Sequence, residues 1–97
     1  MQSFNNFVGI DVSKADFYAC FDEHAESIKF NNTALGINSF LRHMGKNNFN
    51  SENTIIGLES TGSYHLRLCL QCSAQGFTIE WKSTSKLFLS KIKESYM

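Results

Sequence analysis

The sequence has no proline, no net charge and no long apolar run, and these absences narrow the possible classes of protein. No apolar stretch approaches the roughly 20 residues needed to span a bilayer. Residues 1–6 lack the basic start and the apolar stretch of a secretory signal. We therefore expect a soluble, cytoplasmic protein that makes no contact with membranes.

The charges balance, with nine basic and nine acidic side chains giving a formal net charge of zero at pH 7. Most free-standing nucleic-acid-binding modules are basic, so this balance argues against DNA binding by the segment alone. It does not argue against a metal-dependent site acting on DNA. In such a site, bound cations supply positive charge locally, and other domains of the protein can bind the DNA phosphates.

Three cysteines, an odd number, argue against a disulfide framework. Cys69 and Cys72 form a C-x-x-C pair well inside a helical pattern. A redox motif would open a helix, and a zinc site would need a second ligand pair, whereas His24, His43 and His65 are scattered. We interpret the cysteines as small buried residues, with structural zinc or a redox role as alternatives.

Apolar patterning predicts a single α/β domain over residues 1–97, with elements in the order β-β-β-α-β-α-β-α. The expected strands cover residues 4–12, 16–22, 26–31, 54–59 and 77–81. The expected helices begin at Asn32 or Thr33 as the cap, at residue 63 (ending near 75), and at residues 83–85. The chain stops in mid-helix without a glycine cap, so we expect it to be part of a longer protein.

The same patterns predict which side chains form the core. In the second strand, Phe17, Ala19 and Phe21 are expected on one face, with Tyr18 and Cys20 on the other. In the third strand, Ile28 and Phe30 are expected to face inward. In the first helix, the apolar stripe consists of Ile37, Phe40, Leu41 and Met44. In the second helix, the residues expected to face the sheet are Leu66, Cys69, Leu70 and Cys72.

Two acids, Asp11 and Glu59, each follow an apolar run that predicts a buried strand. A carboxylate there costs several kcal/mol unless it is paired or binds a cation. Three strands followed by alternating units predict a mixed sheet with helices on its faces. Right-handed crossovers would place the fourth strand beside the first, so that the two acids converge. Converging acids are typical of a divalent-metal site for phosphodiester chemistry.

Residues 7–14 (FVGIDVSK) and 57–64 (GLESTGSY) together resemble the two opening motifs of the DEDD transposases. This insertion-sequence recombinase family is related to the Piv and MooV invertases. Its pattern is G-I-D-V-S-K on the first strand and E-[ST/A]-T-G-x-Y after the fourth. Either motif alone is weak, but both fall on the expected elements, and the likeness covers essentially the whole chain. It implies a mixed five-stranded RNase H-like fold, similar to that of the RuvC Holliday-junction resolvase.

The resemblance assigns Asp11 to the first carboxylate of a catalytic tetrad and Glu59 to the second. Thr61, Gly62 and Tyr64 match the supporting turn. The third and fourth acids lie in a K-T-D-x-x-D-A motif after the fifth strand and its helix, about where this chain ends. A C-terminal domain that carries a serine implicated in strand transfer is also missing. The resemblance thus implies a transposase in the full-length protein and an inactive part of it here.

The family likeness also implies cofactors and partners. Mg²⁺ or Mn²⁺ suits oxygen ligands, with Asp11 as the bridging ligand and Glu59 completing the shell of one metal. The implied partners are DNA, as element ends and target, a guide RNA encoded by the element, and further copies in a homo-oligomer. The implied location is the bacterial cytoplasm, in association with the nucleoid.

Several further residues have two interpretations each. Lys14 is either a phosphate contact or a solvated turn lysine. Thr61 and Gly62 either bring backbone amides to an anion or form an ordinary helix start. Tyr64 is expected to be packed, with a hydroxyl near the acids as the alternative, and His65 is expected at the surface. A late cluster forms either a solvated helix face or a DNA track: Lys82, Lys86, Lys91 and Lys93.

Two other functions compete with the transposase interpretation. Sugar kinases and actin-like ATPases share this architecture and also open with G-I-D, but a glycine-rich phosphate turn follows. Here Asp11 is followed by Val12, Ser13 and Lys14, with no glycine to let backbone amides surround a phosphate. The second alternative is a non-catalytic assembly module.

Overall fold

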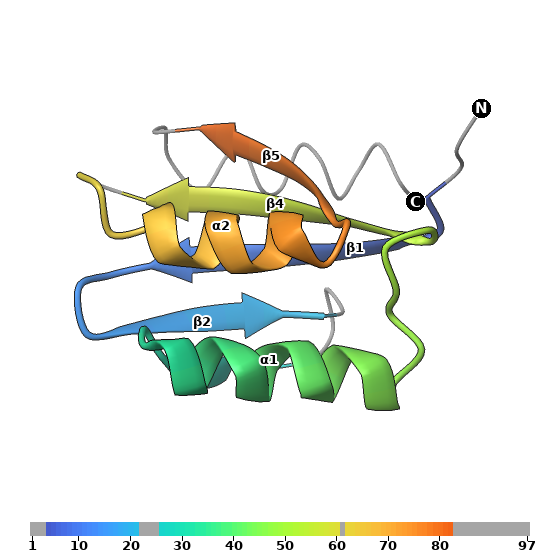
Figure 1. Ribbon diagram of the computed structural model, residues 1–97, viewed down its shortest axis with the longest axis horizontal. Helices are drawn as coiled ribbons and strands as arrows, with labels where there is room; N and C mark the ends of the chain where they lie inside the picture. Colours follow the sequence, from blue (N-terminus) through green and yellow to red (C-terminus); the bar gives the residue numbers. More distant parts are fainter. Residues whose placement is uncertain (1–3, 22–25, 61, 83–97) are drawn as a thin grey trace.

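The computed structural model describes residues 4–21, 26–60 and 62–82, which form a sheet with two helices (Figure 1). The strands are β1 (Asn6–Val12), β2 (Asp16–Cys20), β3 (Ile28–Asn31), β4 (Thr54–Ser60) and β5 (Thr78–Lys82). The helices are α1 (Ala34–Lys46) and α2 (Leu66–Ala74). This sequence of elements confirms the predicted order as far as the fifth strand. The last predicted helix, from residue 83, lies outside the described residues.

The sheet is mixed, and its strand order is β3-β2-β1-β4-β5. The first three strands form an antiparallel meander, while β4 runs parallel to β1 and β5 runs parallel to β4. The central position of β1 and its pairing with β4 confirm the arrangement expected from right-handed crossovers. Two segments far apart in the sequence therefore lie side by side.

Both described helices cover the same face of the sheet (Figure 1), and the main core lies between them and the strands. Val8, Ile10 and Val12 on β1 alternate toward this face, as the two-residue period of a strand requires. Ile37 and Phe40 on α1 are completely buried against it, as predicted. Full burial of such side chains stabilises the fold by roughly 1.5–3 kcal/mol each.

A cluster of aromatic rings fixes α1 to the meander. The ring centroid of Phe17 on β2 lies 5.4 Å from that of Phe30 on β3 and 5.4 Å from that of Phe40 on α1. Phe21 extends the cluster, with its centroid 5.9 Å from Phe40. Stacked and edge-to-face geometries of this kind add to the effect of area burial. The inward orientation predicted for Phe30 is confirmed, and Phe17 and Phe21 share one face, as predicted.

The start of α1 resolves the choice between two predicted caps. The backbone N–H of Gly36 donates to Thr33 Oγ1 at 3.0 Å, so Thr33 is the cap. At the other end the helix continues to Lys46. In the described part of the chain, neither helix is long and apolar enough to cross a membrane.

The predicted inner face of α2 is wrong in part. Cys72 is buried as expected, but Leu66 and Leu70 are 54% and 72% exposed, and the second buried position is Leu68. Two sets of residues with the same spacing of four, 66 with 70 and 68 with 72, fit a helical stripe equally well. Residues 62–65 form turns, so the helix starts three residues later than predicted, and tertiary packing chose the second set.

The edge of the sheet brings another correction. Ile28 was expected to face inward, yet it is 38% exposed. It opens β3, the edge strand, which has a neighbouring strand on one side only. Phe30, two residues on, packs against the core as predicted. Alternation correctly places Ile28 and Phe30 on the same face. At the start of an edge strand, however, fewer neighbouring side chains shield that face from solvent.

Candidate functional site

Asp11 and Glu59 are direct register partners on the neighbouring parallel strands β1 and β4. Register partners project to the same face, and neighbouring strands lie about 4.8 Å apart. Ile10 and Val12 point into the helix-covered core, so alternation places Asp11 on the opposite face. Asp11 is exposed and Glu59 is half-buried. The fold thus brings the two predicted acids together, while their catalytic role stays a prediction.

A row of polar side chains continues across the sheet from this pair. Tyr18 on β2 is the register partner of Asp11, and Lys29 on β3 is the partner of Tyr18. Tyr18 is 44% exposed, so its ring borders the carboxylate pair at the surface. The sequence predicted that Tyr18 lies on the opposite face of its strand from Phe17 but did not connect it with the acids. The antiparallel register, which the sequence does not contain, makes that connection.

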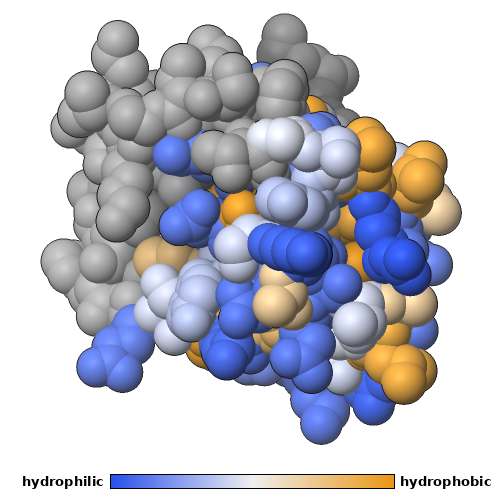
Figure 2. Space-filling view, turned by 90° about the vertical axis from the view of Figure 1, so that its left-hand side faces the viewer, coloured by the Kyte–Doolittle hydropathy of each residue, from blue (hydrophilic) through white to orange (hydrophobic). Residues whose placement is uncertain are grey.

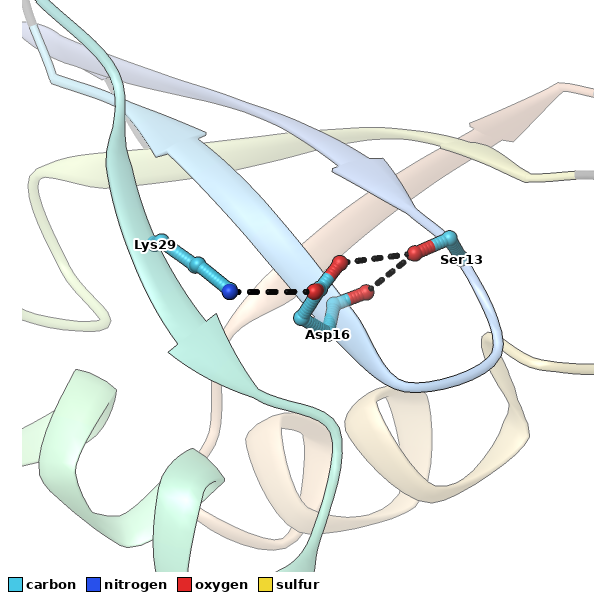
Figure 3. Close-up of polar contacts among 3 residues, drawn as sticks. All are labelled: Ser13, Asp16 and Lys29. Carbon is cyan, nitrogen blue, oxygen red and sulfur yellow. Dashed lines mark hydrogen bonds and ion pairs between the residues drawn. The ribbon is translucent and has the colours of Figure 1, made fainter.

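Asp16 on β2, the next acid along the chain after Asp11, already makes local contacts (Figure 3). Ser13 Oγ donates to Asp16 Oδ1 at 2.8 Å and to the Asp16 carbonyl oxygen at 3.0 Å, and Lys29 Nζ lies 3.5 Å from Asp16 Oδ2. Such a partly exposed ion pair contributes about 0–1 kcal/mol. These contacts close the β1–β2 turn and neutralise Asp16. Asp11, which has no such contact within the described residues, is the better candidate ligand.

The turn after β1 also bears on the nucleotide-binding alternative. The backbone N–H of Ser13 donates to the carbonyl oxygen of Asp16 at 2.9 Å. An amide used in this way does not point at a phosphate, as a phosphate-binding turn requires. Lys14 lies exposed in the same turn, which fits both of its interpretations.

The turn after β4 differs from the prediction at two positions. Tyr64 is 42% exposed rather than packed, and His65 is half-buried rather than at the surface. Gly62 has a φ of +67°, the left-handed region that favours glycine, which gives its place in the motif a physical reason. Thr61 lies outside the described residues. The carbonyl oxygen of Tyr64 accepts a hydrogen bond from Asn32 Nδ2 at 2.9 Å.

Asn32 is the residue near the acids that sequence reasoning missed. The sequence offered it as an alternative helix cap, but its side chain instead contacts the turns that follow β1 and β4. Its position directly after an edge strand carries no local signal of such a role. Only the approach of three separate segments in space makes it visible.

The C-x-x-C pair lies on α2 as free cysteines, and the predicted burial is confirmed for Cys72 and only in part for Cys69. Cys72 is fully buried, and Cys69 is half-buried. Burial, with a smaller contribution from the neighbouring Cys69, raises the pKa of Cys72 to about 12, and burial also raises the pKa of Cys69. A zinc ligand or a redox nucleophile must be a thiolate, so these raised pKa values disfavour both alternatives.

The predicted lysine cluster is only partly visible. Lys86, Lys91 and Lys93 lie outside the described residues, as does His24. Lys82 is the last residue of β5 and the register partner of Glu59, so its backbone belongs to a strand and not to a helix. This position lies before the predicted start of the last helix, so both interpretations of the lysine cluster stay predictions.

The end of the molecule toward which β1 and β4 run has a largely hydrophilic surface where it is described (Figure 2). Apolar side chains gather along one side of this view. The large exposed apolar residues of the two helices are Leu35, Leu66 and Leu70. A polar surface beside paired carboxylates suits a charged ligand better than an apolar one.

Paired carboxylates at the ends of adjacent strands offer oxygen ligands to a hard divalent cation. Within residues 4–21, 26–60 and 62–82, no group of three or more His, Cys, Asp and Glu residues is placed to hold a metal ion. The described chain thus contributes two carboxylates toward a site that would need further ligands. Compared with known proteins, the chain matches no family model and no curated sequence.

Proposed function

We propose that this chain is the N-terminal part of an RNase H-like catalytic domain of a DEDD transposase, which cuts and joins DNA with the help of divalent cations. The observation that carries the proposal is the register pairing of Asp11 with Glu59 on adjacent parallel strands. Each acid also lies within one of the two sequence motifs that resemble this family. The motifs are short local patterns and do not state that the two acids are neighbours in space. The motifs and the strand pairing both support the proposal.

The topology gives further support. A three-stranded antiparallel meander followed by parallel strands, with β1 in the centre, has the element order that the resemblance implies. The two acids lie on β1 and β4, so the candidate site is close to the rigid middle of the sheet. Rigid positioning of ligands is what metal-dependent catalysis needs.

Asp11 and Glu59 would hold Mg²⁺ or Mn²⁺, since both ions prefer carboxylate oxygens. A cation bound there supplies charge stabilisation at a phosphodiester and activates the attacking oxygen. Asp11 on the central strand and Glu59 on its neighbour would hold the ion, because both carboxylates lie on adjacent, rigidly paired strands. The family resemblance implies two further acids as ligands of the same site.

The proposed partners follow from the same assignment. They are the DNA ends and target of an insertion element, an element-encoded guide RNA, and further copies of the protein, in the bacterial cytoplasm with the nucleoid. Exposed Lys14 lies in the turn that follows the strand of Asp11 and would contact phosphate. The engaged amide of Ser13 weighs against the ATPase alternative, and no observation favours a purely assembling module.

The direct test is Mn²⁺ titration of the chain, followed by paramagnetic broadening of its NMR signals. We expect weak binding, with broadening centred on Asp11 and Glu59. Asp11→Asn and Glu59→Gln should each weaken binding by roughly tenfold or more, because even losing a residue that only hydrogen-bonds to a metal ligand typically costs about 10- to 100-fold. Asp16→Asn is the matched control, since Lys29 and Ser13 already engage that carboxylate.

Two results would count against the proposal. Broadening spread evenly over surface acids would remove the case for a cation site. Wild-type transposition by a full-length protein carrying Asp11→Ala or Glu59→Ala would remove the catalytic assignment. The chain by itself is expected to cut no DNA.

A further inference from the structure

Asn32 connects the two loops that leave the sheet beside the candidate carboxylates. Its Nδ2 donates one hydrogen bond to the carbonyl oxygen of Ser13, at 3.0 Å, and another to that of Tyr64, at 2.9 Å. Ser13 directly follows β1, and Tyr64 lies in the turn after β4. One side-chain amide therefore ties together the chain segments that follow Asp11 and Glu59.

The chemistry of this contact fixes the orientation of the amide. Both partners are carbonyl oxygens, which only accept, so only the NH₂ group can face them. Asn32 Oδ1 is buried and has no hydrogen-bond partner among the described residues. Its backbone N–H donates to the carbonyl oxygen of Ala15 at 3.0 Å. A buried acceptor without a partner is costly, so the surrounding chain must hold Asn32 in this place.

The contact lies where the sheet itself stops fixing the spacing of the two strands. Asp11 and Glu59 form the last register pair but one of the β1–β4 ladder, and Val12 with Ser60 is the final pair. Past that pair, the two chains separate into different turns. The Asn32 side chain is a cross-connection beyond the end of the ladder, and it limits how far the two strand ends can spread.

We propose that Asn32 is a positioning residue, which fixes the separation of Asp11 and Glu59 by tying together the loops that follow them. This inference rests on the proposed cation site, whose affinity depends on how closely the two carboxylates are held. Positions fixed to within about 0.5 Å are typical of working sites. Asn32 contacts neither carboxylate, so it acts through the backbone of both loops.

The test measures Mn²⁺ affinity for Asn32→Ala and the milder Asn32→Ser, which keeps one hydroxyl donor. Circular dichroism establishes a temperature at which every variant is folded, and the titrations are made there. We expect Asn32→Ala to weaken Mn²⁺ binding by about 10- to 100-fold, as for other residues that orient ligands. Asn32→Ser should fall between Asn32→Ala and the wild type.

Asn47→Ala is the matched control. Asn47 Nδ2 also donates to a backbone carbonyl, that of His43 at 2.8 Å, but it lies at the far end of α1 from the site (Figure 1). This variant loses the same kind of bond and should keep wild-type Mn²⁺ affinity. An equal loss of affinity in Asn47→Ala would mean that general destabilisation, and not positioning, explains the effect.

The outcomes separate the inference from the proposed function. A folded Asn32→Ala with wild-type affinity overturns the positioning role and leaves the cation site standing. If Asn32→Ala fails to fold, the same result for folded Asn32→Ser decides the question. A wild-type chain with no Mn²⁺ effect at Asp11 and Glu59 overturns both the site and the inference.

Discussion

The carbonyl oxygen of Asn31 occupies the space that any side chain at Gly36 would need. A Cβ built on Gly36 would lie 2.0 Å from this oxygen, far inside van der Waals contact. The first turn of α1 therefore packs directly on the backbone at the end of β3. This close approach holds the segment that contains Thr33, the helix cap, and Asn32, which connects the loops at the candidate site.

Two glycines of α1 should respond in opposite ways to alanine. Gly36→Ala should lower the free energy of unfolding by about 1–3 kcal/mol, because the clash is with backbone and cannot be relieved by a side-chain rotation. Gly45→Ala should raise it by about 0.4–1 kcal/mol, since nothing lies within 4 Å of a Cβ there and alanine favours the helix. Urea unfolding measures both. Equal effects would contradict the close packing of α1 on β3.

The orientation of α2 can be tested with two leucines of one helix. Leu68→Ala should cost about 2–5 kcal/mol, the usual range for a buried leucine, because Leu68 is 1% exposed. Leu70→Ala should change stability by less than about 0.5 kcal/mol, because its side chain is 72% exposed. Chemical denaturation of both variants gives the comparison. A larger loss at Leu70 would mean that the helix is turned by about half a rotation.

Alkaline pH should destabilise the fold through Cys72. Its pKa is raised from 9.0 to about 12 by burial, so between these values the folded state keeps the thiol proton and the unfolded state releases it. Raising the pH therefore favours unfolding, by about 1.4 kcal/mol per pH unit for this one group. The measurement is the slope of unfolding free energy against pH from 9 upward, compared with Cys72→Ala. Parallel slopes for the two proteins would show that Cys72 ionises normally when folded.

Removing one acid of the pair should stabilise the chain when divalent cations are absent. Like charges on register partners repel, so Asp11→Asn should raise the free energy of unfolding by about 0.2–1 kcal/mol at low salt. With excess Mn²⁺ the order should reverse, because the wild type gains more from binding. Thermal unfolding in both buffers measures the change.

The control for this effect is Asp16→Asn, which removes the same charge but also breaks the contact with Lys29. It should bring no gain in stability at low salt. In concentrated salt the gain of Asp11→Asn should disappear, since screening acts on exposed charges. A gain that persists there would point to a cause other than repulsion by Glu59.

Much of the architecture was predictable because its signals are local. Five strands and the first two helices follow from apolar periodicity, and the position of β1 beside β4 follows from crossover handedness. The pairing of Asp11 with Glu59 then needs only that each acid lies near the end of its strand. These inferences required no knowledge of individual contacts, and each of them agrees with the fold.

The failures occur where two local solutions are nearly equal. Leu66 with Leu70, and Leu68 with Cys72, have the same spacing, and the choice depends on where the chain enters the helix after Gly62. The role of Asn32 is of the same kind, since Ser13 and Tyr64 are distant from it in sequence. Periodicity records a residue's neighbours along the chain and does not include partners from other segments.

The sequence by itself determined the strand pattern, the order of the elements and the presence of an acid at the end of each inner strand. These features depend on hydrophobic spacing and chain chirality, which act over short stretches. Only the tertiary structure decided the face of α2 that is buried, the neutralisation of Asp16 by Lys29, and the cross-connection by Asn32. Those features arise from hydrogen bonds and packing between separate segments, whose relative positions are set only when the whole core forms.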